Sequence, residues 1–300
     1  VLGTLIYAEL DNGYDSWAPD NNTDYHTYSD DNGEDSQKTF GGSVRINLNS
    51  SNKYNFTSIS AYTKTNLIHS YDGDWANDQY WYNNHGFDSQ VEGWSYEFFD
   101  KNDKERKSTS QDFRLSFHDF ILGVFYKNLI ESDEANGYLF GGLSNSAKSQ
   151  YDFGVYSGYF KYDWKINPKI KLTTNYRLEK NTIDYSGQSE GMDYYYNTID
   201  LPNVKHSNSF FMNGYRASII IKKTQSLNYF GSIAKGYKSG GVNQQPYINN
   251  KNRNYGPEEL RTLEFGIKYF SDKIYTNINL FHGLRANQQI SISSQQIEGD

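Results

Sequence analysis

"KIKLTTNYRLEKN", residues 169–181, alternates apolar and polar side chains along its length. Successive residues of a β-strand point to opposite faces, so this pattern predicts a strand with two different sides. The apolar side holds Ile170, Leu172, Thr174, Tyr176 and Leu178. The polar side holds Lys171, Thr173, Asn175, Arg177 and Glu179. The strand is therefore predicted to have one apolar face and one strongly polar face.

The same alternation recurs along the chain, whereas helical periodicity does not. It predicts eleven strands, near residues 1–10, 40–49, 54–65, 108–118, 120–131, 151–166, 169–185, 208–222, 225–238, 259–270 and 274–291. Several of these are longer than the ~5–6 residues usual for strands of soluble proteins. Tilted strands that cross a membrane need ~9–11 residues, which agrees better with these lengths.

The connections between the predicted strands alternate between tight turns and long polar loops. Tight turns are predicted at 51–53, 118–119, 167–168, 223–225 and 271–273. Long loops are predicted near 11–39, 66–107, 132–150, 186–207 and 239–258. A soluble β-sandwich has no reason to place every long connection at one end, whereas outer-membrane barrels have short periplasmic turns and longer extracellular loops. The fold class predicted is all-β, an antiparallel transmembrane β-barrel.

Aromatic residues support this prediction. Phe160, Tyr162 and Trp164 share the apolar side of one predicted strand and end at a tight turn, where an interfacial aromatic girdle lies in a barrel. For this strand alone, an aromatic stripe over the core of a soluble sheet explains the pattern equally well. The loop asymmetry favours the membrane barrel.

Composition restricts the function classes. The 300 residues include 17% aromatics, mean hydropathy is −0.84, and there is no cysteine, which excludes disulfides and thiolate metal sites. The net charge of −7 argues against a nucleic-acid partner, because such proteins carry a basic patch or stripe. The sequence contains no apolar run of the ~20 residues that a transmembrane helix needs.

Three segments near the C-terminal end carry a family resemblance. "GYKSGGVN" (236–243), followed by "YGPEEL" (255–260) and "LEFGIK" (263–268), resembles the barrel of TonB-dependent outer-membrane receptors. The matching positions are Gly236, Tyr237, Lys238, Ser239, Gly240, Gly241, Asn243, Pro257, Glu258, Glu264, Gly266 and Lys268. Earlier in the chain, "STSQDFRLSF" (108–117) resembles a Ser-Gln-Glu-x-Arg-Leu strand of the same family more loosely. Mild departures occur at Val242, Asp112 and Leu263. The order and spacing of the motif make the resemblance specific.

The resemblance implies a larger molecule. Receptors of this family close a barrel of ~22 strands around an N-terminal plug domain, so residues 1–300 are expected to be a partial barrel domain, an internal fragment without the plug. An open sheet in lipid would also leave two edges of unpaired backbone groups. By resemblance, we expect contact with outer-membrane lipid, coupling to TonB through the plug, and energy-coupled import of a scarce nutrient, most similar to the iron–siderophore type. We expect no enzymatic activity and no cofactor.

Candidate ligand contacts lie in two of the long loops. Aromatic side chains on a loop offer contact area at little entropic cost. The first loop contributes Trp75, Tyr80, Trp81, Tyr82, Trp94 and Tyr96, and the segment after the family motif contributes Lys238, Asn243, Lys251 and Arg253. The alternative for the aromatics is that they pack their loop against its neighbours.

Other sites find less support in the sequence. The glycines of residues 231–247 lack the spacing of a phosphate-binding P-loop. They are predicted to let the backbone turn from the strand near 225–238 into an extracellular loop. Acidic clusters at 20–35 and 72–78 suit a hard cation, but their spacing is not that of an EF-hand, and a solvated loop is the alternative. Two other function classes stay open: a soluble carbohydrate-binding or glycoside-cleaving β-protein, and a passive porin.

Overall fold

A computed structural model describes residues 1–13, 17–50, 54–139, 142–193, 195, 197–244, 248 and 250–291. Within these ranges one antiparallel sheet contains β1 (Leu2–Gly13), β2 (Glu34–Ser50), β3 (Tyr54–Asp72), β4 (Phe98–Phe117), β5 (Phe120–Leu139), β6 (Gly142–Asn167), β7 (Ile170–Met192), β8 (Thr198–Asp200), β9 (Val204–Lys222), β10 (Leu227–Lys238), β13 (Glu258–Phe270) and β14 (Tyr275–Ala286). Its strand order is β1-β2-β3-β4-β5-β6-β7-β9-β10-β13-β14, and β8 pairs only with β7. The predicted succession of eleven strands is therefore confirmed.

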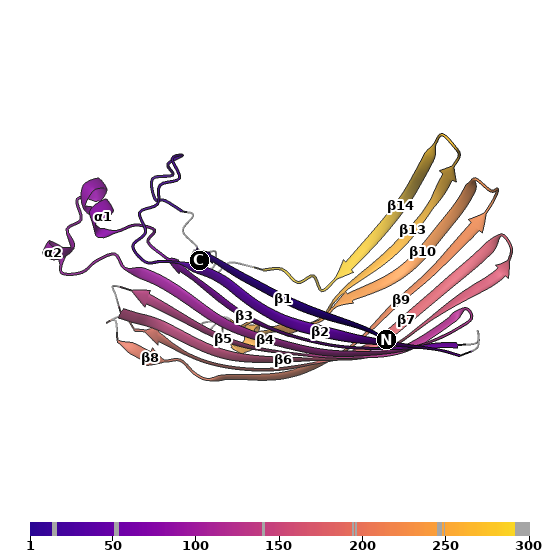
Figure 1. Ribbon diagram of the computed structural model, residues 1–300, viewed down its shortest axis with the longest axis horizontal. Helices are drawn as coiled ribbons and strands as arrows, with labels where there is room; N and C mark the ends of the chain where they lie inside the picture. The colour runs from indigo at the N-terminus through magenta and orange to yellow at the C-terminus, as the bar shows by residue number, and fades with distance from the viewer. Residues whose placement is uncertain are drawn as a thin grey trace.

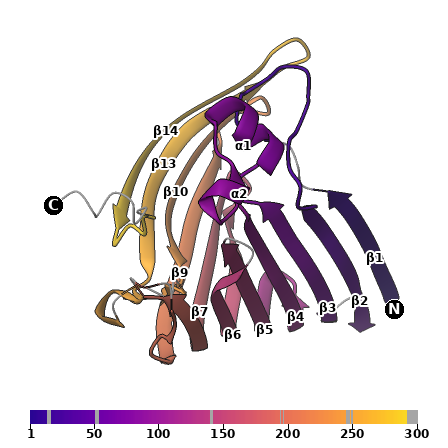
Figure 2. The same ribbon diagram turned by 90° about the vertical axis from the view of Figure 1, so that its left-hand side faces the viewer.

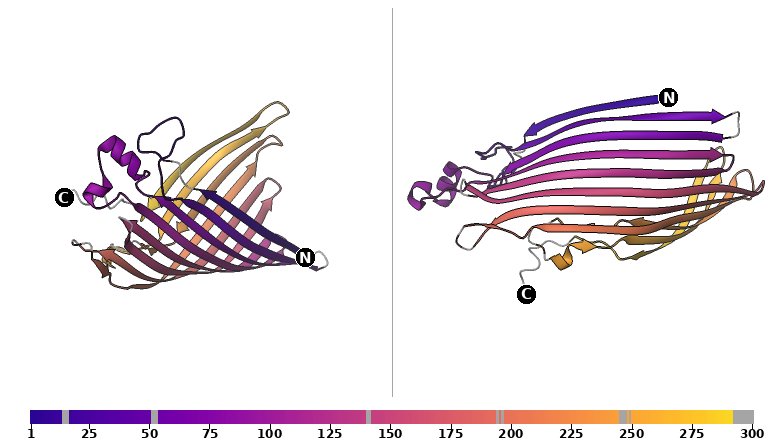
Figure 3. Two further views of the ribbon diagram at one scale, coloured as in Figure 1. Left: turned by 60° about the vertical axis from the view of Figure 1, so that its left-hand side comes forward. Right: turned by 90° about the horizontal axis from the view of Figure 1, so that it is seen from below.

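The sheet curves into an open trough, with β1 and β14 at its two edges (Figures 1 and 2). Both short helices, α1 (Asp78–His85) and α2 (Ser89–Glu92), lie beyond one end of the strands (Figure 3). A small ribbon of β11 (Gly241–Val242) and β12 (Asn254–Tyr255), with the 3-10 turn η1 (Asn250–Asn252), belongs to the connection between β10 and β13. The opposite end carries the tight turns, so all long connections share one end.

The strand register confirms the two predicted faces. Directly paired residues share a face of the sheet. On one face Leu172 lies between Trp164 and Ile219, and on the other Glu179 lies between Ser157 and Met212. We call these the apolar face and the polar face.

Apolar side chains of the apolar face are exposed, not buried. Leu178 is 55% exposed, Ile233 50% and Phe265 54%, although each lies in the middle of a paired strand. A contiguous exposed apolar surface of this extent marks an interaction surface in a water-soluble protein. Over a membrane barrel it is the lipid-facing band.

Strands are longer than predicted at the loop end, and one predicted loop is wrong. Residues 132–150, predicted to be a loop, belong almost entirely to β5 and β6. Three of the other four loops are shortened in the same way, and the loop predicted at 239–258 agrees with the structure to within one residue. These strand ends are polar on both faces and are joined by ion pairs such as Lys148 with Glu134 at 3.0 Å and Lys104 with Asp133 at 2.9 Å. The alternation of apolar and polar residues stops beyond the apolar part of a strand, although the strands remain hydrogen-bonded to each other. The sequence pattern therefore predicts strands that are too short.

The predicted tight turns agree with the structure wherever it describes them. Two residues, His118 and Asp119, connect β4 to β5, and His118 adopts a left-handed φ of 45° as two-residue hairpin turns require. The turns at 167–168, 223–225 and 271–273 also join consecutive strands. The predicted turn at 51–53 and part of the glycine stretch, 245–247, lie outside the described residues.

Candidate functional site

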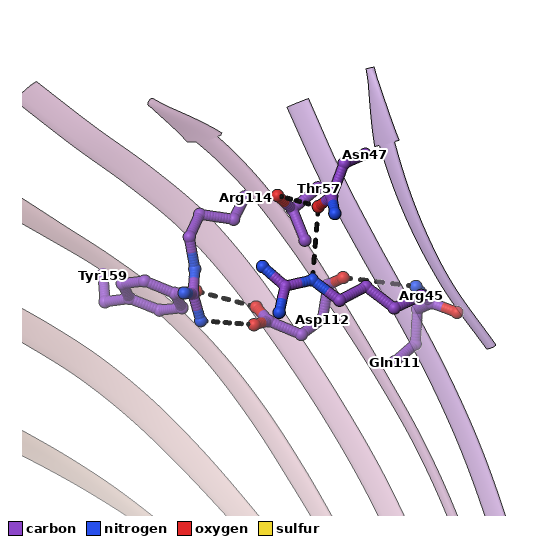
Figure 4. Close-up of polar contacts among 7 residues, drawn as sticks. All are labelled: Arg45, Asn47, Thr57, Gln111, Asp112, Arg114 and Tyr159. Carbon is purple, nitrogen blue, oxygen red and sulfur yellow. Dashed lines mark hydrogen bonds and ion pairs between the residues drawn. The ribbon is translucent and has the colours of Figure 1, made fainter. Parts of the chain in front are cut away.

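A hydrogen-bonded cluster spans three strands on the polar face (Figure 4). Tyr159 of β6 donates its hydroxyl to Asp112 Oδ1 at 2.7 Å and accepts from Arg114 Nε at 3.2 Å. Arg114 also pairs with Asp112 Oδ2 at 2.8 Å. The Tyr159 side chain crosses β5 over Gly123, where an added Cβ would lie 2.2 Å from the ring carbon Cζ. Gly123 is therefore required for this cluster to form.

Further polar side chains extend the cluster in both directions around the sheet. Asn47 Oδ1 accepts from Arg45 Nε at 3.2 Å and from Thr57 Oγ1 at 2.9 Å (Figure 4). Beyond Tyr159, Arg177 donates Nε to Glu179 Oε2 at 2.8 Å. The polar face thus holds its charges in local pairs, as a water-lined wall does.

A cavity of about 530 Å³ opens on this wall. Its charged and polar lining comprises Asp112, Arg114, Tyr159, Lys161, Asn175, Arg177, Arg216 and Lys235. Lys161 pairs with Asp163 at 3.0 Å. Lys235 borders the cavity, but its register with Tyr215 puts its side chain on the apolar face, where it pairs with Glu259 at 2.6 Å. Arg216 makes no ion pair with any residue that the structure describes. The cavity wall therefore carries a local excess of positive charge.

The connection from β10 to β13 folds onto the polar face. Val242 joins Ile183, Tyr185 and Val204 in a small buried apolar cluster. Arg253 is only 2% exposed and donates Nη1 to the backbone oxygen of Asn243 at 3.3 Å. In return, the backbone N–H of Asn243 donates to the Arg253 carbonyl oxygen at 2.7 Å. Two predicted ligand contacts, Asn243 and Arg253, are thus brought together, whereas Lys238 and Lys251 are exposed.

This fold corrects the expected role of the motif glycines. Gly240 and Gly241 do not have positive φ angles. An added Cβ at Gly240 would lie 2.4 Å from the Tyr255 carbonyl oxygen, and one at Gly241 would lie 2.1 Å from the Tyr255 hydroxyl. The glycines allow β11 and β12 to approach closely, and the chain turns inward over the polar face.

Other family-motif residues join the last three strands. Glu264 accepts from Asn279 Nδ2 at 3.0 Å, and Glu258 pairs with Arg285 Nε at 3.2 Å. Lys268 Nζ lies 5.1 Å from the centre of the Phe230 ring, and that ring occupies the space beside Gly266. These residues hold β10, β13 and β14 together.

Three of the predicted aromatic contacts belong to one ring cluster in the connection between β3 and β4. Trp81, Trp94 and Tyr96 gather with Phe87, at ring-centre distances of 4.6 to 4.8 Å. Phe87 is a member that sequence reasoning missed.

The remaining aromatics contact the neighbouring loop or solvent. Buried Tyr80 packs against Tyr28 at 4.5 Å, and Trp75 packs against Trp17 at 4.7 Å. Tyr82 is 55% exposed. Tyr28 and Trp17 come from the loop that joins β1 to β2, and no local sequence signal links them to their partners.

The same two loops also share an acidic junction, formed by Asp30, Asp31, Asp72, Asp74 and Glu97. Asp72 is 1% exposed; its Oδ1 accepts the backbone N–H groups of Asp74 and Trp75, each at 3.1 Å, and its Oδ2 has no partner among the described residues. Loss of water and the charge of Asp72 raise the pKa of Asp74 to about 7 and that of Asp30 to about 6.

The acidic junction brings together members of the two acidic stretches considered for calcium. In the part of the chain that is described, no three His, Asp or Glu side chains are arranged to hold a metal ion. Neither α1 nor α2, the α-helices in the described ranges, is long and apolar enough to cross a membrane.

A curved antiparallel sheet with an apolar outer band, a charged inner face and all long connections at one end defines the wall of a transmembrane β-barrel. The family model described as "TonB dependent receptor-like, beta-barrel" matches residues 4–300, so the chain belongs to the TonB-dependent receptor family. Members of this family are transporters of the bacterial outer membrane and not enzymes. The polar face accordingly lines the barrel lumen.

Solved structures share this fold at low sequence identity. The chain is similar to the ferric yersiniabactin uptake receptor FyuA from Yersinia pestis, with TM-score 0.70 and 12% identity over 88% of this chain and 38% of that one. It is also similar to the copper transporter OprC, with TM-score 0.61 and 13% identity over 85% and 39%.

The siderophore receptor PiuA from Acinetobacter baumannii gives TM-score 0.53 and 14% identity over 93% of this chain and 47% of its own. The chain therefore spans less than half the length of each of these three structures. No curated protein matches the sequence.

Proposed function

We propose that the chain forms part of the wall of an energy-coupled importer and that the imported nutrient is a ferric siderophore. The family assignment supports the importer and argues against the two alternatives, a soluble carbohydrate-active protein and a passive porin. Two of the similar structures, FyuA and PiuA, are named for siderophore uptake, and OprC is named for copper. At 12 to 14% identity these similarities establish the fold alone, so the substrate proposal needs support from this chain itself.

The observation that carries the substrate proposal is the cationic cavity on the lumen wall. Arg114, Lys161 and Arg177 each have a carboxylate partner, and Arg216 has none that the structure describes. A guanidinium offers several N–H donors in a fixed plane, which suits carboxylate and other multi-oxygen anions. Ferric siderophores are often anionic, so such a cargo would find complementary charge on this wall.

The ligand-binding residues proposed from the sequence belong to the extracellular end of the same wall. We propose that Tyr82, Lys238 and Lys251 make the first contacts with cargo, since their side chains are exposed at the loop end of the sheet. Trp81, Trp94 and Tyr96 would present the edge of one ring cluster, and Trp75 the edge of its pair with Trp17. Largely buried Tyr80 and Arg253, with Asn243, would act by holding the loops in place.

Uptake in whole cells tests the proposal. A strain lacking the gene would be offered ⁵⁵Fe-labelled catecholate, hydroxamate and phenolate siderophores, with haem, cobalamin and a glycan as comparison cargoes. We expect loss of uptake of one ferric siderophore class, restoration by the wild-type gene, and abolition by a protonophore. Arg216→Gln should lower uptake several-fold, whereas Arg261→Gln, at an exposed position already paired with Glu259, should not.

Two results would contradict different parts of the proposal. Uptake that persists after the protonophore would contradict energy coupling. Energy-dependent uptake of haem, cobalamin or the glycan, with all siderophores unaffected, would contradict the substrate and leave the importer standing.

A further inference from the structure

The apolar face contains a furrow that the transport proposal does not use. A cavity of about 570 Å³ lies over Gly158, and its outward-pointing apolar walls are Phe113, Val124, Tyr126, Tyr156, Leu178 and Phe211. Gly158 pairs with Val124 on one side and Leu178 on the other. A Cβ added at Gly158 would find no atom within 4 Å, so the furrow floor is open space. The furrow is wide because Gly158 has no side chain, whereas Val124 and Leu178 on either side do.

The furrow lies at the upper edge of the lipid-facing band. Phe120 and Trp164 lie next to the tight-turn end, and Tyr126 and Tyr156, whose rings are 5.2 Å apart, lie six and eight residues farther along. At ~3.3 Å per residue this is about 20 to 26 Å along the strand. With barrel strands tilted by ~40°, this corresponds to a height of about 15 to 20 Å, and the aromatic rings at both ends extend it toward the ~25 Å of a typical apolar band. The furrow therefore opens where acyl chains of the outer leaflet meet their headgroups.

A lysine stands at the rim of the furrow. Lys180 pairs directly with Tyr156 and Phe211, and its Nζ lies 5.4 Å from the centre of the Phe211 ring, which is 79% exposed. It makes no ion pair with any residue in the described ranges. The nearest carboxylates on this face, Asp152 and Asp184, stand four residues farther along their strands, roughly 13 Å away at strand spacing. An apolar stem with a cationic tip is suited to the membrane interface.

Three other lysines of the outer face have carboxylate partners. Lys38 pairs with Glu9 at 2.9 Å, and Lys64 and Lys107 both pair with Glu105, at 2.6 and 2.5 Å. Lys180 differs from these three lysines, because it has no carboxylate partner among the described residues and stands beside the furrow. The positive charge of Lys180 and the apolar furrow beside it together favour a ligand with an anionic headgroup and an apolar chain.

We propose that this furrow binds one acyl chain of an outer-leaflet lipid whose phosphate headgroup pairs with Lys180. The acyl chain lies over Gly158 between Val124 and Leu178, under the Tyr126 and Tyr156 rings. The Lys180 ammonium and the phosphate form a charge-assisted contact at the interface, with the exposed Phe211 ring beside it. The proposal does not depend on the identity of the cargo.

Native mass spectrometry of the protein purified from its own outer membrane tests this site. Phosphatidic acid and diacylglycerol with the same chains would be titrated separately into the detergent-solubilised protein. We expect retention of phosphatidic acid, with Lys180→Gln lowering its affinity about fivefold, the usual effect of one lysine near an anionic surface. Gly158→Leu adds a side chain whose Cβ meets no atom within 4 Å, and it should lower affinity about tenfold by removing space for several methylene groups.

Matched controls separate this site from the general lipid annulus. Gly231→Leu lies on the same face, where an added Cβ meets neighbours at an ordinary 3.5 Å, and Lys38→Gln removes a rim lysine that is already paired. Both controls should bind as wild type does, and all variants should show wild-type heat-modifiability on gels. Equal retention of the two lipids, or equal loss in test and control variants, would overturn the proposal. If Gly158→Leu does not fold, the affinity of Lys180→Gln for phosphatidic acid still tests the proposal, because this substitution is a mild change at the surface of the wall.

Discussion

Substituting Gly123 by alanine should destabilise the barrel wall although it adds only a methyl group. The new Cβ would lie 2.2 Å from Tyr159 Cζ and 2.4 Å from its hydroxyl oxygen, so the ring must leave its position over β5. That movement breaks the hydrogen bonds from Tyr159 to Asp112 and from Arg114 to Tyr159. Each involves a charged group, and for half-buried partners we expect a total loss of about 2 to 4 kcal/mol.

Urea unfolding of the protein in lipid vesicles measures this loss as a change in midpoint at constant slope. Gly158→Ala on the neighbouring strand is the control, because its Cβ meets nothing within 4 Å, and it should cost about 0.5 kcal/mol or less. In a Tyr159→Ala background, Gly123→Ala should also become nearly neutral, because the obstructing ring is gone. A similar cost of Gly123→Ala with and without Tyr159 would refute this explanation.

Three further predictions concern the connections at the loop end. Asn77→Ala removes the N-cap bond of α1, from the Tyr80 N–H to Asn77 Oδ1 at 2.9 Å, and the bond from Asn77 Nδ2 to the Tyr28 carbonyl oxygen at 2.7 Å. It should speed amide exchange of residues 78–85 by the equivalent of about 1 to 2 kcal/mol. Unchanged exchange would contradict the capping role of Asn77. Because the pKa of Asp74 is raised from 3.8 to about 7, the acidic junction should be most stable below pH 4 and lose that stability as the pH rises through 7. Amide exchange of residues 73–97, corrected for intrinsic rates, should become faster as the pH rises through 7. Asp74→Asn should largely remove this pH dependence. The same pH dependence in the wild type and in Asp74→Asn would contradict the role of Asp74. Arg253→Met should release the β11–β12 ribbon from the lumen face and raise protease cleavage of residues 241–255 roughly thirtyfold, for a loss of about 2 kcal/mol, whereas Lys251→Met, at an exposed position, should leave cleavage unchanged. Equal cleavage of the two variants would contradict an anchoring role for Arg253.

Much of the wall could be predicted because alternate residues of a barrel strand face lipid and lumen, and their side chains are apolar and polar accordingly. The sequence of 169–181 assigns Leu178 to the apolar face and Glu179 to the polar face, and their partners across β6 and β9 obey the same assignment. The loop asymmetry gave the orientation of all strands. The prediction failed at 132–150, because alternation of apolar and polar residues ends where both faces meet water, while pairing is held by ion pairs such as Lys148 with Glu134.

Contacts between distant segments were not predictable from local pattern. Nothing in the sequence near Tyr80 indicates that Tyr28 packs on it, and nothing near Gly123 indicates that Tyr159 crosses it. Both contacts depend on the register of long strands and on loops folding against each other. The inward fold of the β11–β12 ribbon has the same origin, since Gly240 and Gly241 are spaced for close approach to Tyr255, and a glycine pair alone also suits an outward turn.

Thiol labelling in intact cells tests most directly that this sheet is an outer-membrane wall with its loops outside. Residues 1–300 contain no cysteine, so each single substitution adds one thiol to this part of the wall. Tyr82→Cys in α1, Leu178→Cys on the apolar face and Asp272→Cys in a tight turn would be treated with a membrane-impermeant maleimide added to whole cells. Labelling is expected at position 82, at position 272 only after the outer membrane is opened, and at position 178 only with a lipid-soluble reagent. Labelling of 272 but not 82 in intact cells, or of 178 by the impermeant reagent, would contradict the orientation and the membrane wall.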